Sequence, residues 1–149
     1  NTDGQCVAIC VPDCTGEPCS DDGCGGTCGG CPDGEGCDSE GQCIIPTVPA
    51  DVASVFASHC TGCHKGSSPP EGLNLLADVA YSNLVGMPSA NEPSELLVTP
   101  GDSENSMLMW RLEKSNGQNL MPPGNKKMPD ADIETIKSWI DSLPSGDAP

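Results

Sequence analysis

The first third of this 149-residue chain has almost nothing with which to build an apolar core. All of the aromatic residues follow residue 48; they are Phe56, Tyr81, Trp110 and Trp139. In place of a core, nine of the 11 cysteines lie between Cys6 and Cys43. A segment this small needs cross-links, because its burial cannot offset the entropy of ordering the chain. We therefore expect residues 1–43 to form a small, loop-rich module of their own.

Basic side chains are also missing from this part. The first 48 residues carry nine acids and no lysine or arginine, and the rest carries 13 acids against six bases, which accounts for the net charge of −16. An acidic excess on both parts repels phosphate backbones and anionic lipid surfaces. The charge thus argues against nucleic acid and membrane surfaces as partners, and it suits either solubility or docking to a protein partner with a basic face.

Long apolar runs are absent as well. No segment approaches the roughly 20 apolar residues that a membrane-spanning helix needs, so we expect no membrane span. The chain opens on the polar run "NTDGQ", and Asn1 is not typical of a translation start. We interpret this as a mature, exported chain whose signal peptide has been removed. That places it in the periplasm, on the cell surface or outside the cell.

The cysteines of the N-terminal module favour disulfides over a metal site. They stand at irregular short intervals with no histidine among them, and the chain has the marks of export. Eight cysteines from Cys10 to Cys43 can form four bridges. Cys6 is then the odd one, and it either pairs within the module or bridges to another chain. The run "CSDDGCGGTCGGCPDGEGC" resembles short Cys/Gly-rich modules of secreted bacterial surface proteins.

A Pro-containing linker, residues 44–50, leads into a second domain, residues 51–149, in which the pattern becomes helical. Apolar residues at helical spacing predict four helices, at residues 50–64, 76–86, 103–115 and 130–143. Ser103 and Asp130 are the expected N-caps of the last two. The last helix carries an apolar stripe, formed by Ile133, Ile136, Ile140 and Leu143.

The motif "HCTGCH" at residues 59–64 allows three interpretations. A zinc site needs about four ligands, and His59 and His64 flank the cysteine pair too tightly to close a tetrahedron with it. A redox pair would be expected at a strand-to-helix junction, and here the motif ends a helix. A covalent c-type haem explains every group: Cys60 and Cys63 add to the two vinyl groups, and His64 is the proximal iron ligand.

The sixth iron position calls for a methionine or a second histidine in an electron carrier. His59 adjoins Cys60 and cannot reach the opposite face of the same haem. The five methionines remain, namely Met87, Met107, Met109, Met121 and Met128. Met107 and Met109 lie in a predicted helix and suit core packing. Met121 and Met128 both precede proline in "NLMPPGNKKMPD", where a stiff loop loses little entropy on ordering.

Several segments of the second half resemble the successive signatures of bacterial single-haem class I cytochrome c domains. They are "VFASHCTGCHKG", "LVGMPS", "VTPGDSENSML", "MPPG" and "IETIKSWIDSL", within residues 50–144. The resemblance implies an all-α domain of about four helices around one haem c. It implies that Phe56 packs on an aromatic of the C-terminal helix, Trp139, and that Met121 is the distal ligand, with Met128 as the alternative.

The pocket expected around this haem is apolar. Its candidate residues are Leu73, Leu75, Leu76, Leu84, Leu96, Leu97, Leu108, Leu112, Leu120 and Ile136, for which plain helix packing is an equal alternative. A backbone carbonyl near Lys65–Gly66 is expected to accept the His64 Nδ1–H and fix its tautomer. Arg111 either pairs with a haem propionate or is an ordinary surface arginine.

These features predict an electron-transfer protein rather than an enzyme. A peroxidase-like enzyme needs an open sixth site and distal acid–base groups, and the "MPP" loop supplies neither. A third alternative is a haem-bearing surface or adhesive protein that acts through the Cys-rich module. The module and Cys6 also suggest carriers assembled into a homo-oligomer or filament, in which neighbouring haems exchange electrons.

Overall fold

The computed structural model describes residues 36–37, 43–114, 117–124 and 127–144. The chain divides into two compact units, Asn1–Pro46 and Thr47–Pro149. In the first unit, β1 (Gly36–Cys37) pairs antiparallel with β2 (Cys43–Ile44), and Cys43 is disulfide-bonded. Cys6 and most of the predicted disulfide framework lie outside the described residues, so the cross-linked module stays a prediction.

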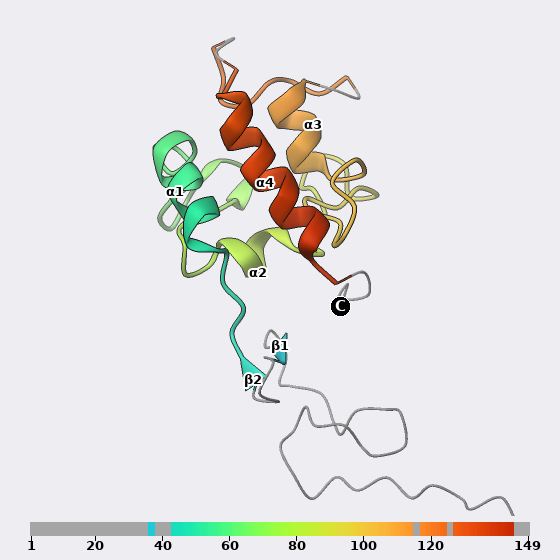
Figure 1. The fold of residues 1–149 in the computed structure, drawn as a ribbon. Helices are drawn as coiled ribbons and strands as arrows, with labels where there is room; N and C mark the ends of the chain where they lie inside the picture. Colours follow the sequence, from blue (N-terminus) through green and yellow to red (C-terminus); the bar gives the residue numbers. More distant parts are fainter. Residues whose placement is uncertain (1–35, 38–42, 115–116, 125–126, 145–149) are drawn as a thin grey trace, which may run out of the picture. The chain divides into compact units, whose positions relative to one another are not determined.

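The second unit is mostly helical, as predicted. Its helices are α1 (Ala50–His59), α2 (Ala80–Leu84), α3 (Met107–Glu113) and α4 (Asp130–Ser142), with a short 3₁₀ turn at Pro70–Gly72. Helix α4 packs on both α1 and α3, and Figure 1 shows it lying between them. No helix in the described part of the chain is long and apolar enough to cross a membrane.

The core forms where α1 meets α4. Phe56 of α1 is fully buried, and its ring meets Trp139 of α4 edge to face with 6.3 Å between the ring centroids. Tyr81 of α2 lies against the same indole, 6.4 Å away. The stripe of isoleucines on α4 is buried because residues three and four apart share one helix face. Val48 is buried too, so packing begins before α1.

Two predicted helix caps are wrong. Helix α3 begins at Met107 after Ser106, whereas Ser103 lies in the preceding turn with its N–H bonded to Asp141 Oδ1. The side chain of Ser106 is engaged in that turn, accepting from the Thr99 N–H and donating to the Asp102 carbonyl. Asp130 is the first residue of α4 rather than its cap, and its carboxylate accepts a hydrogen bond from Lys127.

The helices predicted at 50–64 and 76–86 are shorter than expected. Helix α1 ends at His59, and the cysteine motif follows it as a turn. Helix α2 spans five residues, because the chain after it turns into short bridges that pair Val85 with Val98 and Pro88 with Leu96. Backbone bonds between the 84–89 and 95–98 segments satisfy groups that a longer helix would have paired internally.

Candidate functional site

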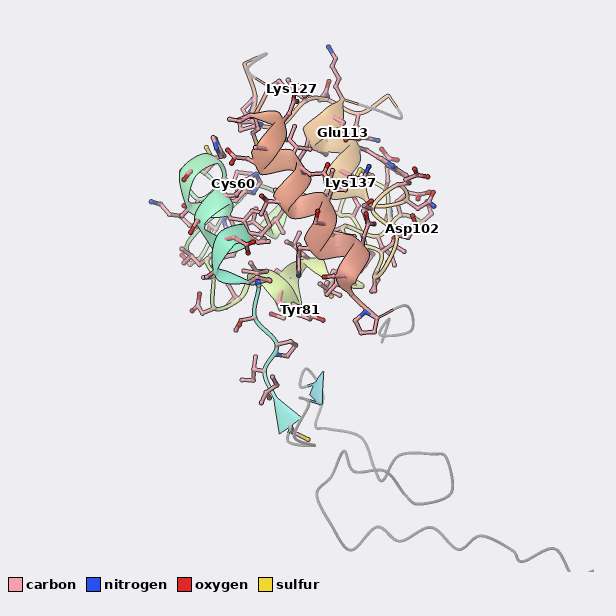
Figure 2. All side chains as sticks on the ribbon, viewed as in Figure 1. Cys60, Tyr81, Asp102, Glu113, Lys127 and Lys137 are labelled. Carbon is pink, nitrogen blue, oxygen red and sulfur yellow. The ribbon has the colours of Figure 1, made fainter. Side chains whose placement is uncertain are left out.

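The turn that follows α1 brings both thiols and the histidine of the motif together. The N–H groups of Cys60 and Thr61 bond to the Phe56 carbonyl, and those of Cys63 and His64 bond to the Cys60 carbonyl at 3.1 and 2.9 Å. This continues one helical turn past α1, which sets Cys60, Cys63 and His64 along the lining of one pocket. Figure 2 shows Cys60 at this end of α1, beside α4.

His64 is oriented by a backbone carbonyl, but that carbonyl is not the one expected. His64 Nδ1 lies 3.2 Å from the carbonyl oxygen of Leu73, so the prediction of an acceptor near Lys65–Gly66 is wrong. The loop after the motif folds back far enough for Leu75 N–H to bond to the His64 carbonyl at 2.9 Å. A proton held on Nδ1 leaves the Nε2 lone pair free for a metal.

The pocket has a volume of about 550 Å³ and is bounded mainly by apolar side chains. That volume lies in the range of roughly 300–1,000 Å³ typical of cofactor sites. Six of the ten predicted pocket residues line it, namely Leu73, Leu75, Leu84, Leu97, Leu108 and Leu112. The other four do not: Leu76 is exposed, Ile136 is fully buried in the core, and Leu96 and Leu120 are half-buried elsewhere.

The cysteines suit thioether bonds to a porphyrin. Both are free thiols, with Cys60 half-buried and Cys63 exposed. Burial raises the pKa of the Cys60 thiol to about 11, because its environment disfavours a thiolate. A thioether carries no charge, so this setting suits Cys60 linked to a vinyl group better than Cys60 as a thiolate metal ligand. The described residues also contain no cluster of three or more His, Cys, Asp or Glu side chains able to hold a metal ion.

Three methionines line the pocket, and the structure separates the two that precede proline in the "MPPG…KKMPD" loop. Met121 lines the pocket with Pro122 and Pro123, and its N–H bonds to the Arg111 carbonyl at the end of α3 at 2.8 Å. Met128 is buried in the hydrophobic core and is not among the described residues lining the pocket. Met87 and Met107 line it as well.

The remaining predicted residues fall into two groups. Arg111 is half-buried and lines the pocket, within the wall that α3 supplies. Phe56 and Trp139 do not line it; they pack behind the cysteine turn, where the Phe56 carbonyl holds the Cys60 amide. Their contribution is therefore to position the turn rather than to touch a bound group.

One contact beside the motif has no signature in the sequence. His59 Nε2 lies 2.9 Å from Asp132 Oδ2, which joins the end of α1 to the first turn of α4. The two residues are 73 positions apart, and each belongs to a helix whose polar face faces solvent. Only the paired arrangement of α1 and α4 identifies them as partners.

Residues 47–140 match the family model for cytochrome c oxidase, cbb3-type, subunit III, and this match covers well over half of the chain. No curated protein and no solved structure gives a significant match. The matched segment contains the cysteine turn, the pocket and the Met121 loop, and such domains bind haem and transfer electrons. The chain thus has a single-haem class I cytochrome c domain and belongs to the cbb3-type subunit III family of cytochromes c.

Proposed function

We propose that this protein is an exported electron carrier with one haem c, attached through Cys60 and Cys63 and ligated by His64 and Met121. The observation that carries the proposal is the meeting of these four side chains in one largely apolar pocket. When bound, the haem supplies reversible one-electron chemistry at iron. Cys60 and Cys63 would hold it through thioether bonds, His64 and Met121 would bind its iron, and the apolar lining would exclude water.

Met121 is preferred over Met87 because of its burial and the stiffness of its loop. The Met87 side chain is exposed. Met121 is half-buried and is followed by Pro122 and Pro123, which line the pocket with it. A thioether on a loop stiffened by proline loses little entropy on ordering, which supports Met121.

Electron transfer is favoured over peroxidase chemistry. The chain has two histidines. His64 is the proposed proximal ligand, and His59 is bonded to Asp132. The residues that flank Met121 in the sequence are Leu120, Pro122 and Pro123, which offer no acid–base group for cleaving a peroxide bond. Arg111, in the same wall, is the proposed partner of a propionate.

Absorption spectra of the purified holoprotein test this function. We expect a low-spin c-type spectrum, reversibly reduced and oxidised, with the weak red band of methionine bound to ferric iron. Met121→Ala should abolish that band and give an iron that binds cyanide or imidazole at once, while Met128→Ala and Met87→Ala should retain it. A wild-type protein with high-spin iron would contradict the proposal.

We further propose that chains associate through the N-terminal module. The basis is the odd number of cysteines in this module, which leaves one over when the others pair. Electrophoresis with and without reductant tests a Cys6 bridge between chains. We expect a covalent dimer band that reductant and Cys6→Ser both convert to the monomer, and a monomer band under both conditions would exclude the covalent version.

A further inference from the structure

The loop that carries Met121 is hydrogen-bonded to the loop that follows α2. Gln118 Nε2 donates to Glu92 Oε1 at 2.7 Å. Residues 88–91 and residues 121–123 both line the pocket. Glu92 directly follows the first of these segments and Gln118 stands three residues before the second, so their bond joins the two loops at the pocket.

Glu92 stands on a backbone that is itself fixed. The Glu95 N–H bonds to the Glu92 carbonyl at 2.9 Å, and the Ser89 N–H bonds to the Glu95 carbonyl at 2.8 Å. Pro88 and Leu96 form a bridge beside this turn. Glu92 is thus a fixed acceptor, and the Gln118 loop is the partner that can move away from it.

The Met121 loop has few other attachments. Within the described stretch 117–124, its hydrogen bonds to the rest of the domain are Met121 N–H to the Arg111 carbonyl and Gln118 to Glu92. Any movement that withdraws the Met121 thioether from the pocket pulls on both. The side-chain bond is at the surface, where it can open and reclose readily.

We propose that Glu92 and Gln118 are positioning residues that hold the Met121 loop closed and so set how fast the distal thioether leaves the iron. The inference rests on the proposed ligation by Met121. Loss of the pair should leave the haem attached and low-spin, but should admit external ligands to the iron faster. In this way, one hydrogen bond at the surface would control how readily external ligands reach the haem iron.

The test is the rate at which imidazole binds the oxidised holoprotein, at imidazole concentrations high enough that departure of Met121 limits the rate. Glu92→Ala and Gln118→Ala should each raise this limiting rate roughly two- to five-fold, the scale of one surface side-chain hydrogen bond. The double variant should be no faster than the faster single variant, because both remove the same bond. All should keep the red methionine band.

Two further variants separate positioning from general loosening. Ser94→Ala removes a hydroxyl from the same turn that does not reach the Met121 loop, and it should leave the rate unchanged. Gln118→Glu sets two carboxylates against each other, so its rate should exceed that of Gln118→Ala at neutral pH. That excess should shrink as the ionic strength is raised, because salt screens the repulsion between two exposed carboxylates.

Unchanged limiting rates in both single alanine variants would overturn the inference, and so would effects that add fully in the double variant. A high-spin wild type that binds imidazole without a limiting step would instead overturn Met121 ligation itself. The two failures are therefore distinguishable.

Discussion

The two walls of the haem pocket are held in very different ways. The His64 wall is fixed by four successive backbone bonds in the cysteine turn, by the Leu73 carbonyl on Nδ1 and by the return bond from Leu75, besides two thiols available for covalent attachment. In the described residues, the Met121 loop has one backbone bond and one side-chain bond to the rest of the domain. His64, the proposed proximal ligand, is therefore held by a rigid turn, whereas Met121, the proposed distal ligand, is held by bonds that can open.

The largest effect is expected from the packing of Phe56 on Trp139, behind the cysteine turn. Phe56→Ala removes a fully buried ring that packs on Trp139, and it should lower the free energy of unfolding by about 3–5 kcal/mol. Chemical denaturation followed by helix content measures this. Ile45→Ala, at an exposed position outside the core, should change it by less than about 0.5 kcal/mol. A loss below about 1 kcal/mol in Phe56→Ala would show that the Phe56–Trp139 packing does not support the cysteine turn.

Met128 sharpens the comparison, because it is close in sequence to Met121 but packs in the core. Met128→Ala should cost about 2–4 kcal/mol of unfolding free energy while the red methionine band stays. Met121→Ala should do the reverse, losing the band. Denaturation and absorption spectra of both variants, measured side by side, decide the matter. Loss of the band in Met128→Ala would reverse the assignment of the two methionines.

A smaller effect is expected where α1 and α4 are joined beside the motif. Asp132→Ala breaks the half-buried bond to His59 and should lower the free energy of unfolding by about 0.5–1.5 kcal/mol. Glu134→Ala, at an exposed position on the same helix, is the matched control and should be near neutral. Equal losses in the two variants would mean that the contact between His59 and Asp132 contributes nothing to the free energy of unfolding.

The smallest effect is expected where α3 leads into the Met121 loop. Lys114 ends this helix in the left-handed conformation, with φ 55° and ψ 45°, which costs energy for a residue with a Cβ. Lys114→Gly removes that cost but adds freedom to the unfolded chain, so the net gain should be about 0.5 kcal/mol. Thermal unfolding of the holoprotein would detect it as a slightly higher midpoint, and a lower midpoint would contradict the reasoning.

Local patterns in the sequence were enough to predict the two longest helices, α1 and α4, and to identify a candidate haem-attachment motif. The spacing of Cys60, Cys63 and His64 is typical of that motif, and α1 and α4 have apolar residues at helical intervals. Such patterns involve neighbours only a few positions apart, so they can be recognised without knowledge of the fold. The family match supports the same interpretation, a helical cytochrome c domain.

The parts that could not be predicted depend on the folded chain. The acceptor for His64 is a backbone carbonyl nine residues away, and a carbonyl gives no signature in the side-chain sequence. The caps at Ser103 and Asp130 were wrong because α3 begins only at Met107 and α4 begins at Asp130 itself. Residue chemistry alone also did not distinguish Met128 from Met121, since both precede proline, and only the resemblance to class I cytochromes c favoured Met121.

In this account, His64 is firmly fixed and Met121 is the one methionine that binds the iron and can be released from it. NMR of the reduced holoprotein with isotope-labelled methionine methyl groups tests this most directly. We predict that one of the five methyl signals is shifted far upfield by the porphyrin ring current, and that Met121→Leu removes that signal while Met87→Leu and Met128→Leu retain it. A shifted signal that persists in Met121→Leu, or no shifted signal at all, would contradict the account.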